Sequence, residues 1–378
     1  MKILVTKIGA NITWSKSVTS AANTDIKYLL SCLDTQTDFD ISIISKKTRN
    51  TIIPKKYKFI NLNDSSFQNV TEEHDVLVVF NGSINFFGGA RDESPLNIYR
   101  LMNTCSKEQK PIFVINTDGQ LILKKLWPMI HKREWATDLS ANEFDIDESN
   151  VHYISQFRNV NELIRDDAER KKKIVIPKEN TMFIDLAASM LCHGKIKGFD
   201  PRINYPKLED RKIDLTYGGY TRNTYRRKRL QHFYFNPILK KLKLKLKLFG
   251  NLRDFGIVNR VSPSQFIRIM RSSRATIIVG DKEYENNTFT LRMYESILSG
   301  VIVFIDSKFD QKCRFYNGIE GTQNLYIRNT EEFVDSFFSD YNIAEMEELT
   351  DKIYEEKYLN FSVEKYTSEL ASLLTPMS

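Results

Sequence analysis

The chain has 378 residues, 41% of them hydrophobic, and a formal net charge of +7. These values are typical of a globular protein with more than one domain. No run of about eighteen apolar residues occurs, so the sequence predicts no membrane-spanning helix, and the opening MKILVTKIG is typical of a strand and not of a signal peptide. The four cysteines and five histidines show no metal-ligand spacing. We therefore expect reduced thiols and identify no metal ligands.

The N-terminal half alternates short apolar strands with helices. Helices are expected at about 24–32 and 96–109, and strands at 2–9, 41–45, 58–62, 76–80, 111–116 and 152–155. Alternation at this spacing predicts a parallel α/β sheet. No GxGxxG follows the first strand, so a standard dinucleotide site is not indicated.

A second alternating series follows a proline-containing linker at 201–208. Its strands are expected at 213–217, 242–249, 276–279, 301–305 and 325–327, and helices at about 344–357 and 363–374 end the chain. The chain is therefore predicted to hold two α/β sheets in tandem.

Three basic runs stand out, at 169–173, 222–229 and 240–247. Such runs fit phosphate-rich partners or plain solvated faces, and the solvated face is favoured for 169–173. The alternation KLKLKLKL at 241–248 predicts a strand with leucines inward and lysines outward. We favour a sheet edge that its lysines protect from aggregation over a direct contact with DNA.

Four predicted strands end in segments rich in glycine or polar residues. Ligands of open α/β sheets bind beyond the carboxyl ends of the strands, so these segments are the candidate binding sites. They are NGSINFFGG at 81–89, Thr117-Asp118, YGGYTRNTYR at 217–226 and the segment 280–295.

The last two segments carry arginines. Gly218-Gly219 would let the backbone approach a ligand closely, and Arg222 and Arg226 lie four residues apart, on one face if helical. With Arg292 they form a set of three arginines that could surround one diphosphate.

Arg292 and Glu295 are expected to share one face of a helix that Thr290 caps. An arginine at the positive end of a helix suits a phosphate, and a glutamate one turn later suits sugar hydroxyls, so the pair fits a nucleoside diphosphate. An ordinary salt bridge on a solvated helix fits the same spacing, and this segment alone slightly favours it.

The first two segments offer a carboxylate and two aromatic rings. Asp118 could act as a base in group transfer from a nucleotide-activated donor, although an aspartate after a strand is more commonly a turn or cap residue. Phe86 and Phe87 before Gly88-Gly89 predict either insertion into a base stack or a loop folded onto its own domain.

Several segments resemble one known family. They include VVFNGSINFFGG at 78–89, Thr117-Asp118, IDLTYGG at 213–219 with Arg222 and Arg226, and IIVGDKEYENNTFTLRMYE at 277–295. Through them the chain resembles the T-even-type bacteriophage DNA β-glucosyltransferases, which act on 5-hydroxymethylcytosine. The resemblance covers most of the chain in order and spacing, whereas 179–211 and the C-terminal helices match poorly.

The resemblance implies an α/β protein of the GT-B glycosyltransferase type, with two Rossmann-like domains facing a central cleft. Residues 1–195 would bind the DNA acceptor and residues 196–360 the UDP-sugar donor, and a helix in 361–378 would cross back to the first domain.

The resemblance also implies site residues. Asp118 would be the catalytic base, Glu295 would bind the ribose, and the backbone of Val261 would face uracil. The diphosphate would be bound by Arg222, Arg226 and Arg292, beside Gly218, Gly219 and Tyr220. The DNA-binding loop would comprise Ser83, Asn85, Phe86, Phe87, Gly88 and Gly89.

The chain departs from the family near the donor. Tyr220 stands where the family has a small serine, and Asn23, Thr24 and Asp25 offer no clean match to the family's sugar-contacting glutamate. Glucose is therefore the default sugar, and a pentose such as arabinose is an alternative.

We expect an inverting transfer of this sugar to the hydroxymethyl group of 5-hydroxymethylcytosine in flipped-out bases of duplex DNA. The ligands would be a UDP-sugar and Mg²⁺ or Mn²⁺, and the enzyme a monomer in the cytoplasm of the infected bacterial host. A glycosyltransferase acting on a non-DNA acceptor and a DNA-binding protein without transfer activity are the alternatives. Duplex binding and UDP binding would discriminate between them.

Overall fold

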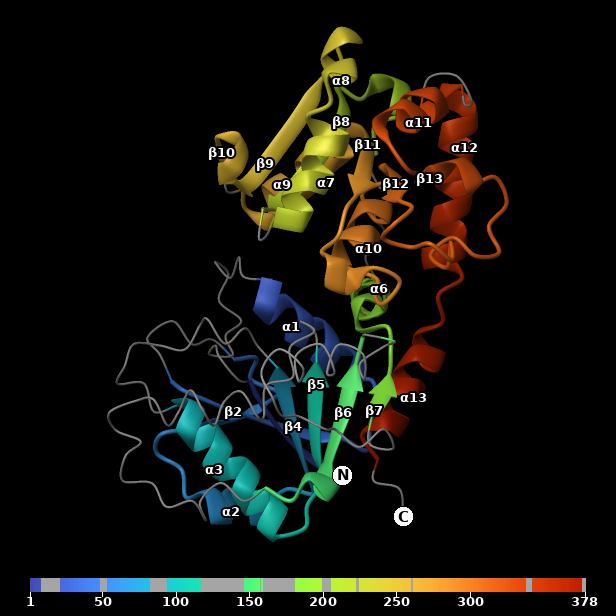
Figure 1. Ribbon diagram of the computed structural model, residues 1–378. Helices are drawn as coiled ribbons and strands as arrows, with labels where there is room; N and C mark the ends of the chain where they lie inside the picture. The colour runs from blue at the N-terminus through green and yellow to red at the C-terminus, as the bar shows by residue number, and fades with distance from the viewer. Residues whose placement is uncertain are drawn as a thin grey trace. The chain divides into compact units, whose positions relative to one another are not determined.

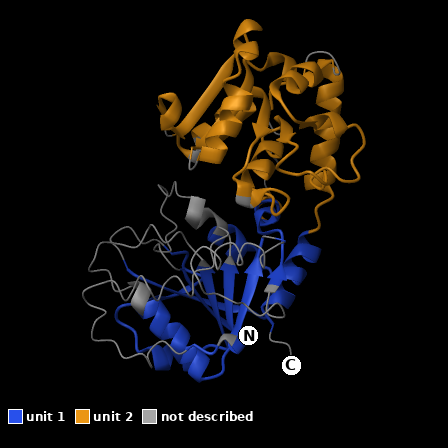
Figure 2. Ribbon diagram, in the orientation of Figure 1, with its two compact units in different colours: residues 1–193, 363–378 blue, residues 194–362 orange. Residues whose placement is uncertain are grey.

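The computed structural model describes most of the chain as two compact units. Unit 1 comprises residues 1–193 and 363–378, and unit 2 comprises residues 194–362 (Figure 2). The described residues are 1–7, 21–47, 53–81, 94–116, 146–156, 158, 181–198, 205–221, 224–259, 261–337 and 342–375.

Unit 1 is built on a parallel sheet of seven strands in the order β3-β2-β1-β4-β5-β6-β7. The strands are β1 (Lys2–Lys7), β2 (Asp40–Ser45), β3 (Lys58–Asn61), β4 (Val76–Asn81), β5 (Ile112–Asn116), β6 (Val151–Ser155) and β7 (Thr181–Phe183). Central strands such as β4 are apolar at successive positions because both faces of the sheet are buried.

The described helices of unit 1 are α1 (Ala21–Leu33), α2 (Phe67–Glu72), α3 (Ser94–Lys107) and α13 (Val363–Leu373), and α6 (Ser189–Ile196) begins in unit 1 and ends in unit 2. Helix α2 packs with α3, and α1 packs with α13 (Figure 1). The C-terminal α13 is held to unit 1 by Tyr366, whose hydroxyl donates to the Asp185 carbonyl at 3.0 Å.

Unit 2 contains a sheet of six strands in the order β10-β9-β8-β11-β12-β13 (Figure 1). The strands are β8 (Ile213–Tyr220), β9 (Leu246–Leu252), β10 (Ile257–Asn259), β11 (Ser273–Ile278), β12 (Ile302–Asp306) and β13 (Tyr326–Ile327). All pair in parallel except β10, which runs antiparallel to β9. The helices are α7 (Thr224–Tyr234), α8 (Pro237–Lys241), α9 (Pro263–Arg271), α10 (Leu291–Ile297), α11 (Thr330–Asp335) and α12 (Ile343–Tyr354), which continues as a π-helical turn at Glu355–Leu359.

The direction of strand addition reverses once in each sheet. In unit 1, β1 lies between β2 and β4, and in unit 2, β8 lies between β9 and β11. The connections from the two neighbouring strands therefore leave on opposite sides, and a crevice opens at the carboxyl ends of the strands at this switch point. The fold predicts one ligand site per unit, at the β1/β4 and β8/β11 edges.

The predicted α/β architecture is confirmed, and most predicted strands of the described residues agree within a few positions. The short β7 and β10 were not predicted, because three residues carry too little pattern. The four cysteines are free thiols. Within the described residues, no helix has the length and apolarity needed to span a bilayer.

The prediction of a strand over 242–249, with KLKLKLKL alternating between two faces, is wrong for its first half. Helix α8 occupies Pro237–Lys241, capped by the Asn236 side chain, which accepts from the Ile238 N–H at 3.1 Å. The strand β9 begins only at Leu246, and Leu242 and Leu246 are exposed.

Helix α8 ends in a motif that could not be predicted from the sequence. Lys243 adopts the left-handed conformation, with φ of 56°. Its N–H donates to the Lys240 carbonyl at 3.0 Å, and the Leu244 N–H donates to the Leu239 carbonyl at 3.1 Å. This pair of bonds is a Schellman motif, in which glycine normally occupies the left-handed position.

We expect Lys243→Gly to raise the free energy of unfolding by about 1 kcal/mol, because it relieves the left-handed strain of an L-residue. Chemical denaturation of the whole chain measures the effect. Lys245→Gly is the matched control and should lower stability, since Lys245 has no positive φ. Equal losses in both variants would contradict the assigned motif.

Candidate functional site

The switch point of unit 2 is bridged by a buried hydroxyl. The pairing of β8 with β11 ends at Thr216 and Thr276. Beyond it, Tyr234 of α7 places its hydroxyl between the strands, where it accepts from the Ile277 N–H at 2.7 Å. The same hydroxyl lies 2.7 Å from the Ile277 carbonyl and 3.1 Å from the Thr216 carbonyl, its two possible acceptors. Burial raises the pKa of Tyr234 well above its usual value, so the hydroxyl keeps its proton.

The adjacent glycines of β8 are required by packing. A Cβ added to Gly218 would lie 2.3 Å from the Phe249 ring and 3.0 Å from the Phe266 ring, and one added to Gly219 would lie 2.7 Å from the Tyr217 hydroxyl. We predicted that these glycines let a ligand approach. In the structure, the space beside them is filled by aromatic side chains of the unit itself.

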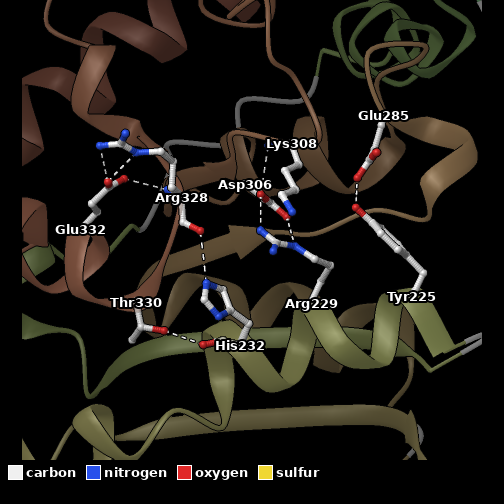
Figure 3. A network of polar contacts seen from close by, with 9 residues as sticks. All are labelled: Tyr225, Arg229, His232, Glu285, Asp306, Lys308, Arg328, Thr330 and Glu332. Carbon is white, nitrogen blue, oxygen red and sulfur yellow. Dashed lines mark hydrogen bonds and ion pairs between the residues drawn. The ribbon is translucent and has the colours of Figure 1, made fainter.

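Helix α7 is tied to the loops after β11 and β12 by polar contacts. Arg226 pairs with Asp281, with 2.8 Å between Nη2 and Oδ2, and both side chains are largely buried. One turn later, Arg229 donates to both oxygens of Asp306 at 2.6 Å, a bidentate pair (Figure 3).

A third contact extends this network. The Tyr225 hydroxyl donates to Glu285 (Figure 3). Burial, with the nearby charge of Asp306, raises the pKa of Glu285. Together with the two ion pairs, this contact fixes the first turns of α7 over the carboxyl ends of β11 and β12.

Arg292 lies in the first turn of α10, the α-helix that follows β11. Its guanidinium stacks on the Phe266 ring at 3.9 Å, and Nη1 lies 3.0 Å from Glu295 Oε2. The N–H bonds do not point along that line, so Nη1 is buried without a hydrogen-bond partner among the described residues. The predicted i,i+3 ion pair is therefore present, and Nη1 can donate a hydrogen bond to a further oxygen.

The dipole argument for this helix is weaker than the sequence suggested. Thr290 is the N-cap residue, but its side chain makes no capping bond, and α10 has only 7 residues. A helix this short supplies a small dipole. Anion binding here would rest on the Arg292 charge.

Two further predicted donor residues are described. Tyr220 ends β8 with 47% of its surface exposed. Val261 precedes Ser262, whose side chain forms a capping box with Gln265 at the start of α9. The structure brings Gly218, Gly219, Arg226, Arg292 and Glu295 to the connections that leave β8 and β11.

The remaining predicted residues lie outside the described residues: Asp118, Arg222, Ser83, Asn85, Phe86, Phe87, Gly88 and Gly89. The strands that lead to them are described. Asn81 at the end of β4 is paired with Asn116 at the end of β5. Strands β4 and β5, which directly precede residues 82–90 and Thr117-Asp118 in the chain, therefore end side by side at the same edge of the sheet.

The described residues do not form a metal-binding cage. None of them belongs to a group of three or more His, Cys, Asp or Glu side chains that could hold an ion. Asp281, just after β11, and Asp306, at the end of β12, are engaged by arginines.

A cavity of about 130 Å³ lies at the opposite, amino ends of the strands, between Arg211, Gly300 and Glu347. Arg211 donates there to the Ser273 carbonyl at 2.9 Å, and burial lowers its pKa to about 10. Ligands of such sheets bind at the carboxyl ends, so we do not place the donor in this cavity.

Three residues of the site were missed by the sequence analysis: Tyr234, Phe266 and Asp281. Asp281 lies three residues after the end of β11, so its place just beyond a strand was a usable signal. The other two act through contacts between distant segments, for which the sequence gives no local signal.

The comparisons with known proteins agree with this architecture. A family model described as bacteriophage T4 beta-glucosyltransferase matches residues 1–184. The DNA beta-glucosyltransferase of Enterobacteria phage T4 is 28% identical over 348 residues, which cover 89% of this chain and 88% of that protein.

Solved structures share the fold. A structure of the phage T4 enzyme BGT in complex with UDP and Mn²⁺ is 22% identical, with full coverage of both chains and a TM-score of 0.74. WaaG, a glycosyltransferase involved in lipopolysaccharide biosynthesis, is 10% identical over 99% of this chain and 100% of its own, with a TM-score of 0.51. The chain therefore has the GT-B fold of glycosyltransferases. The resemblance to the phage DNA β-glucosyltransferases predicted from the sequence is confirmed.

We expect Tyr234→Phe to lower the free energy of unfolding by about 1–3 kcal/mol, because it leaves the buried Ile277 N–H without its acceptor. Denaturant titration measures the loss. Tyr220→Phe removes a hydroxyl from an exposed ring and should change stability little. Indistinguishable values for the two variants would show that the hydroxyl bridge is not needed.

Gly218→Ala should cost about 1–3 kcal/mol of stability through overpacking against Phe249. In a Phe249→Leu background the same change should cost less, because the shorter side chain leaves room. A double-mutant cycle measures this coupling. A cost that is the same in both backgrounds would refute the packing explanation.

Proposed function

We propose that the chain is an inverting, UDP-sugar-dependent DNA glycosyltransferase. It moves a sugar, glucose by default, from the UDP-sugar to the hydroxymethyl group of 5-hydroxymethylcytosine in duplex DNA. The observation that carries the proposal is the pair of arginines, Arg226 and Arg292, which come from two helices to the carboxyl edge of β8 and β11. This edge is where an open α/β sheet binds a nucleotide.

In the proposed reaction the donor diphosphate lies between these arginines and Arg222. Arg226 is held by Asp281 and Arg292 by Phe266 and Glu295, so both positive charges are positioned before the substrate arrives. Fixed charges of this kind stabilise the negative charge that develops on the leaving UDP without reorganising in the transition state. Glu295 accepts hydrogen bonds from the ribose, and the backbone of Val261 contacts uracil.

Asp118 acts as the general base. Its carboxylate takes the proton of the hydroxymethyl group while that oxygen attacks the anomeric carbon. The new C–O bond forms as the bond between the anomeric carbon and the diphosphate oxygen breaks from the opposite face, so the configuration inverts. UDP is a weak base, so the reaction needs no general acid.

A divalent cation, Mg²⁺ or Mn²⁺, would accompany the diphosphate of the donor. Such an ion would supply positive charge to the leaving group. No step above depends on it.

The acceptor base is flipped out of the duplex before reaction, and the loss of base stacking costs roughly a few kcal/mol. The loop with Ser83, Asn85, Phe86, Phe87, Gly88 and Gly89 would occupy the space that the base leaves. We propose a monomer that works in the cytoplasm of the infected bacterial host, where phage DNA is available.

A pentose donor such as UDP-arabinose is the second candidate. Tyr220, a bulky exposed residue at the end of β8, favours it because its ring reduces the room beside the diphosphate site. Mass spectrometry of hydroxymethylated DNA incubated with UDP-glucose or UDP-arabinose decides between the sugars. No mass gain with either donor would contradict the DNA acceptor.

Replacing the proposed base should change the transfer rate, and replacing a proposed diphosphate ligand should change the affinity for UDP. Asp118→Asn should lower the transfer rate by about 10²–10⁴-fold with UDP affinity unchanged, because only the proton acceptor is lost. Arg292→Ala should weaken UDP binding by roughly 10–100-fold, because a charge-assisted contact is lost. Calorimetry and single-turnover transfer measure the two effects.

Matched controls are Asp147→Asn and Arg328→Ala, which remove like charges from exposed positions. Both controls should transfer sugar and bind UDP at wild-type levels. Parallel loss of UDP binding and transfer in Asp118→Asn would remove Asp118 from the base role, and unchanged UDP affinity in Arg292→Ala would remove Arg292 from the site.

A further inference from the structure

The positive charge of the chain is concentrated in one segment of unit 2. Residues 224–259 contain ten Lys and Arg residues and a single acidic residue, Asp254, for a net charge of +9. The rest of the chain has 45 basic and 47 acidic residues and so carries a net charge of −2. This one segment therefore accounts for the whole net positive charge of the protein.

Seven of these ten cations are exposed and form no ion pair with a carboxylate of the described residues, and five of the seven follow one another closely along the chain. We call Lys240, Lys241, Lys243, Lys245 and Lys247 the lysine stripe. All five are exposed. None forms an ion pair with a carboxylate of the described residues, whereas Arg226, Arg227 and Arg229 of α7 all do. The charge of the stripe is thus left uncompensated on the surface.

The stripe follows the chain from the end of α8 into β9, at the border of the sheet (Figure 1). Strand β10 pairs only with Gly250, Asn251 and Leu252 of β9. Among the described strands, none pairs with the outer edge of β9 from Leu246 to Phe249. This stretch is therefore an open, lysine-bearing margin of the unit.

The fold does not require these lysines. Lys243 occupies the left-handed position of the Schellman motif, where glycine is the residue that backbone geometry favours. A residue that breaks a local rule without a compensating contact points to a role outside folding. Protection of an edge strand also explains Lys245 and Lys247, but it does not explain the lysines on α8 and its turn.

We infer that the lysine stripe is a docking surface for the phosphate backbone of duplex DNA, formed by residues other than those proposed at 83–89. The choice of DNA rests on the function proposed above. Alternate residues of extended chain are about 6.6 Å apart, a spacing at which flexible lysines can each reach a phosphate. Such contacts carry no sequence information, so they would hold the enzyme on DNA between modified bases.

The test compares two triple variants of the full chain. Lys243/Lys245/Lys247→Gln removes three charges from the stripe. Lys207/Lys212/Lys312→Gln removes three exposed lysines elsewhere in unit 2 and gives the same net charge. Binding to an unmodified, fluorescein-labelled duplex of about 30 base pairs is followed by anisotropy from about 50 to 200 mM NaCl.

For the stripe variant, we expect the slope of log K against log salt to fall in magnitude by about 2 to 3, since each lost phosphate contact removes about 0.9. The control variant should change the slope by less than about 1. An unchanged slope in the stripe variant, or an equal change in both variants, overturns the inference.

Exposed Leu242 and Leu246 lie among these lysines, so vesicles of anionic phosphatidylglycerol form a second arm. Loss of vesicle binding with retained duplex binding in the stripe variant assigns the surface to membranes and overturns the inference. Sugar transfer is assayed separately at saturating hydroxymethylated DNA, where the stripe variant should keep its kcat and show a raised KM for DNA. If the wild type transfers sugar but the stripe variant shows no change in the salt slope, only this inference is defeated. If the wild type transfers no sugar but the stripe variant does change the salt slope, only the proposed function is defeated.

Discussion

The buried hydroxyl of Tyr234 lies between two parallel strands at the centre of unit 2. Where β8 and β11 stop pairing, Tyr234 completes the hydrogen bonds that the diverging backbones would otherwise lack, at 2.7 Å from both the N–H and the carbonyl of Ile277. Because buried backbone groups must be satisfied, the strands can separate there only with such a partner. The divergence is what makes room for a ligand at the switch point of the sheet. The same tyrosine ends α7, so the helix that carries Arg226 is fixed to the site by its own C-terminus.

The charges around this edge are held by partners within the unit. Asp281 and Asp306 are almost fully buried, and each engages an arginine of α7. Burying such pairs costs desolvation energy that good geometry offsets only in part. Their value lies in position: Arg226 is oriented by Asp281, and Arg292 is oriented by the Phe266 ring and Glu295. Arginines fixed in this way can receive a diphosphate with little reorganisation.

Local sequence patterns predicted much of this fold, and the features that they missed depend on contacts between distant segments of the chain. The apolar run at 76–80 was enough to predict β4, because a strand buried on both faces is apolar at every position. The alternation at 241–248 misled, since it is local and the turn at Lys243 depends on bonds back to Leu239 and Lys240. At the site, the spacing of Arg292 and Glu295 placed both on one helix face. The partner of Arg226, by contrast, is 55 residues away at Asp281, and the Phe249 ring that requires Gly218 lies on the neighbouring strand. No pattern within either segment could reveal these pairs.

The central claim is that the β8/β11 switch point binds the diphosphate of a nucleotide sugar. A crystal structure of the protein with UDP tests it most directly. The account predicts diphosphate oxygens within hydrogen-bonding distance of Arg292 Nη1, the buried donor that has no hydrogen-bond partner among the described residues, and of Arg226. UDP bound at the amino ends of these strands, beside Arg211, with Arg292 still contacting only Phe266 and Glu295, would contradict it.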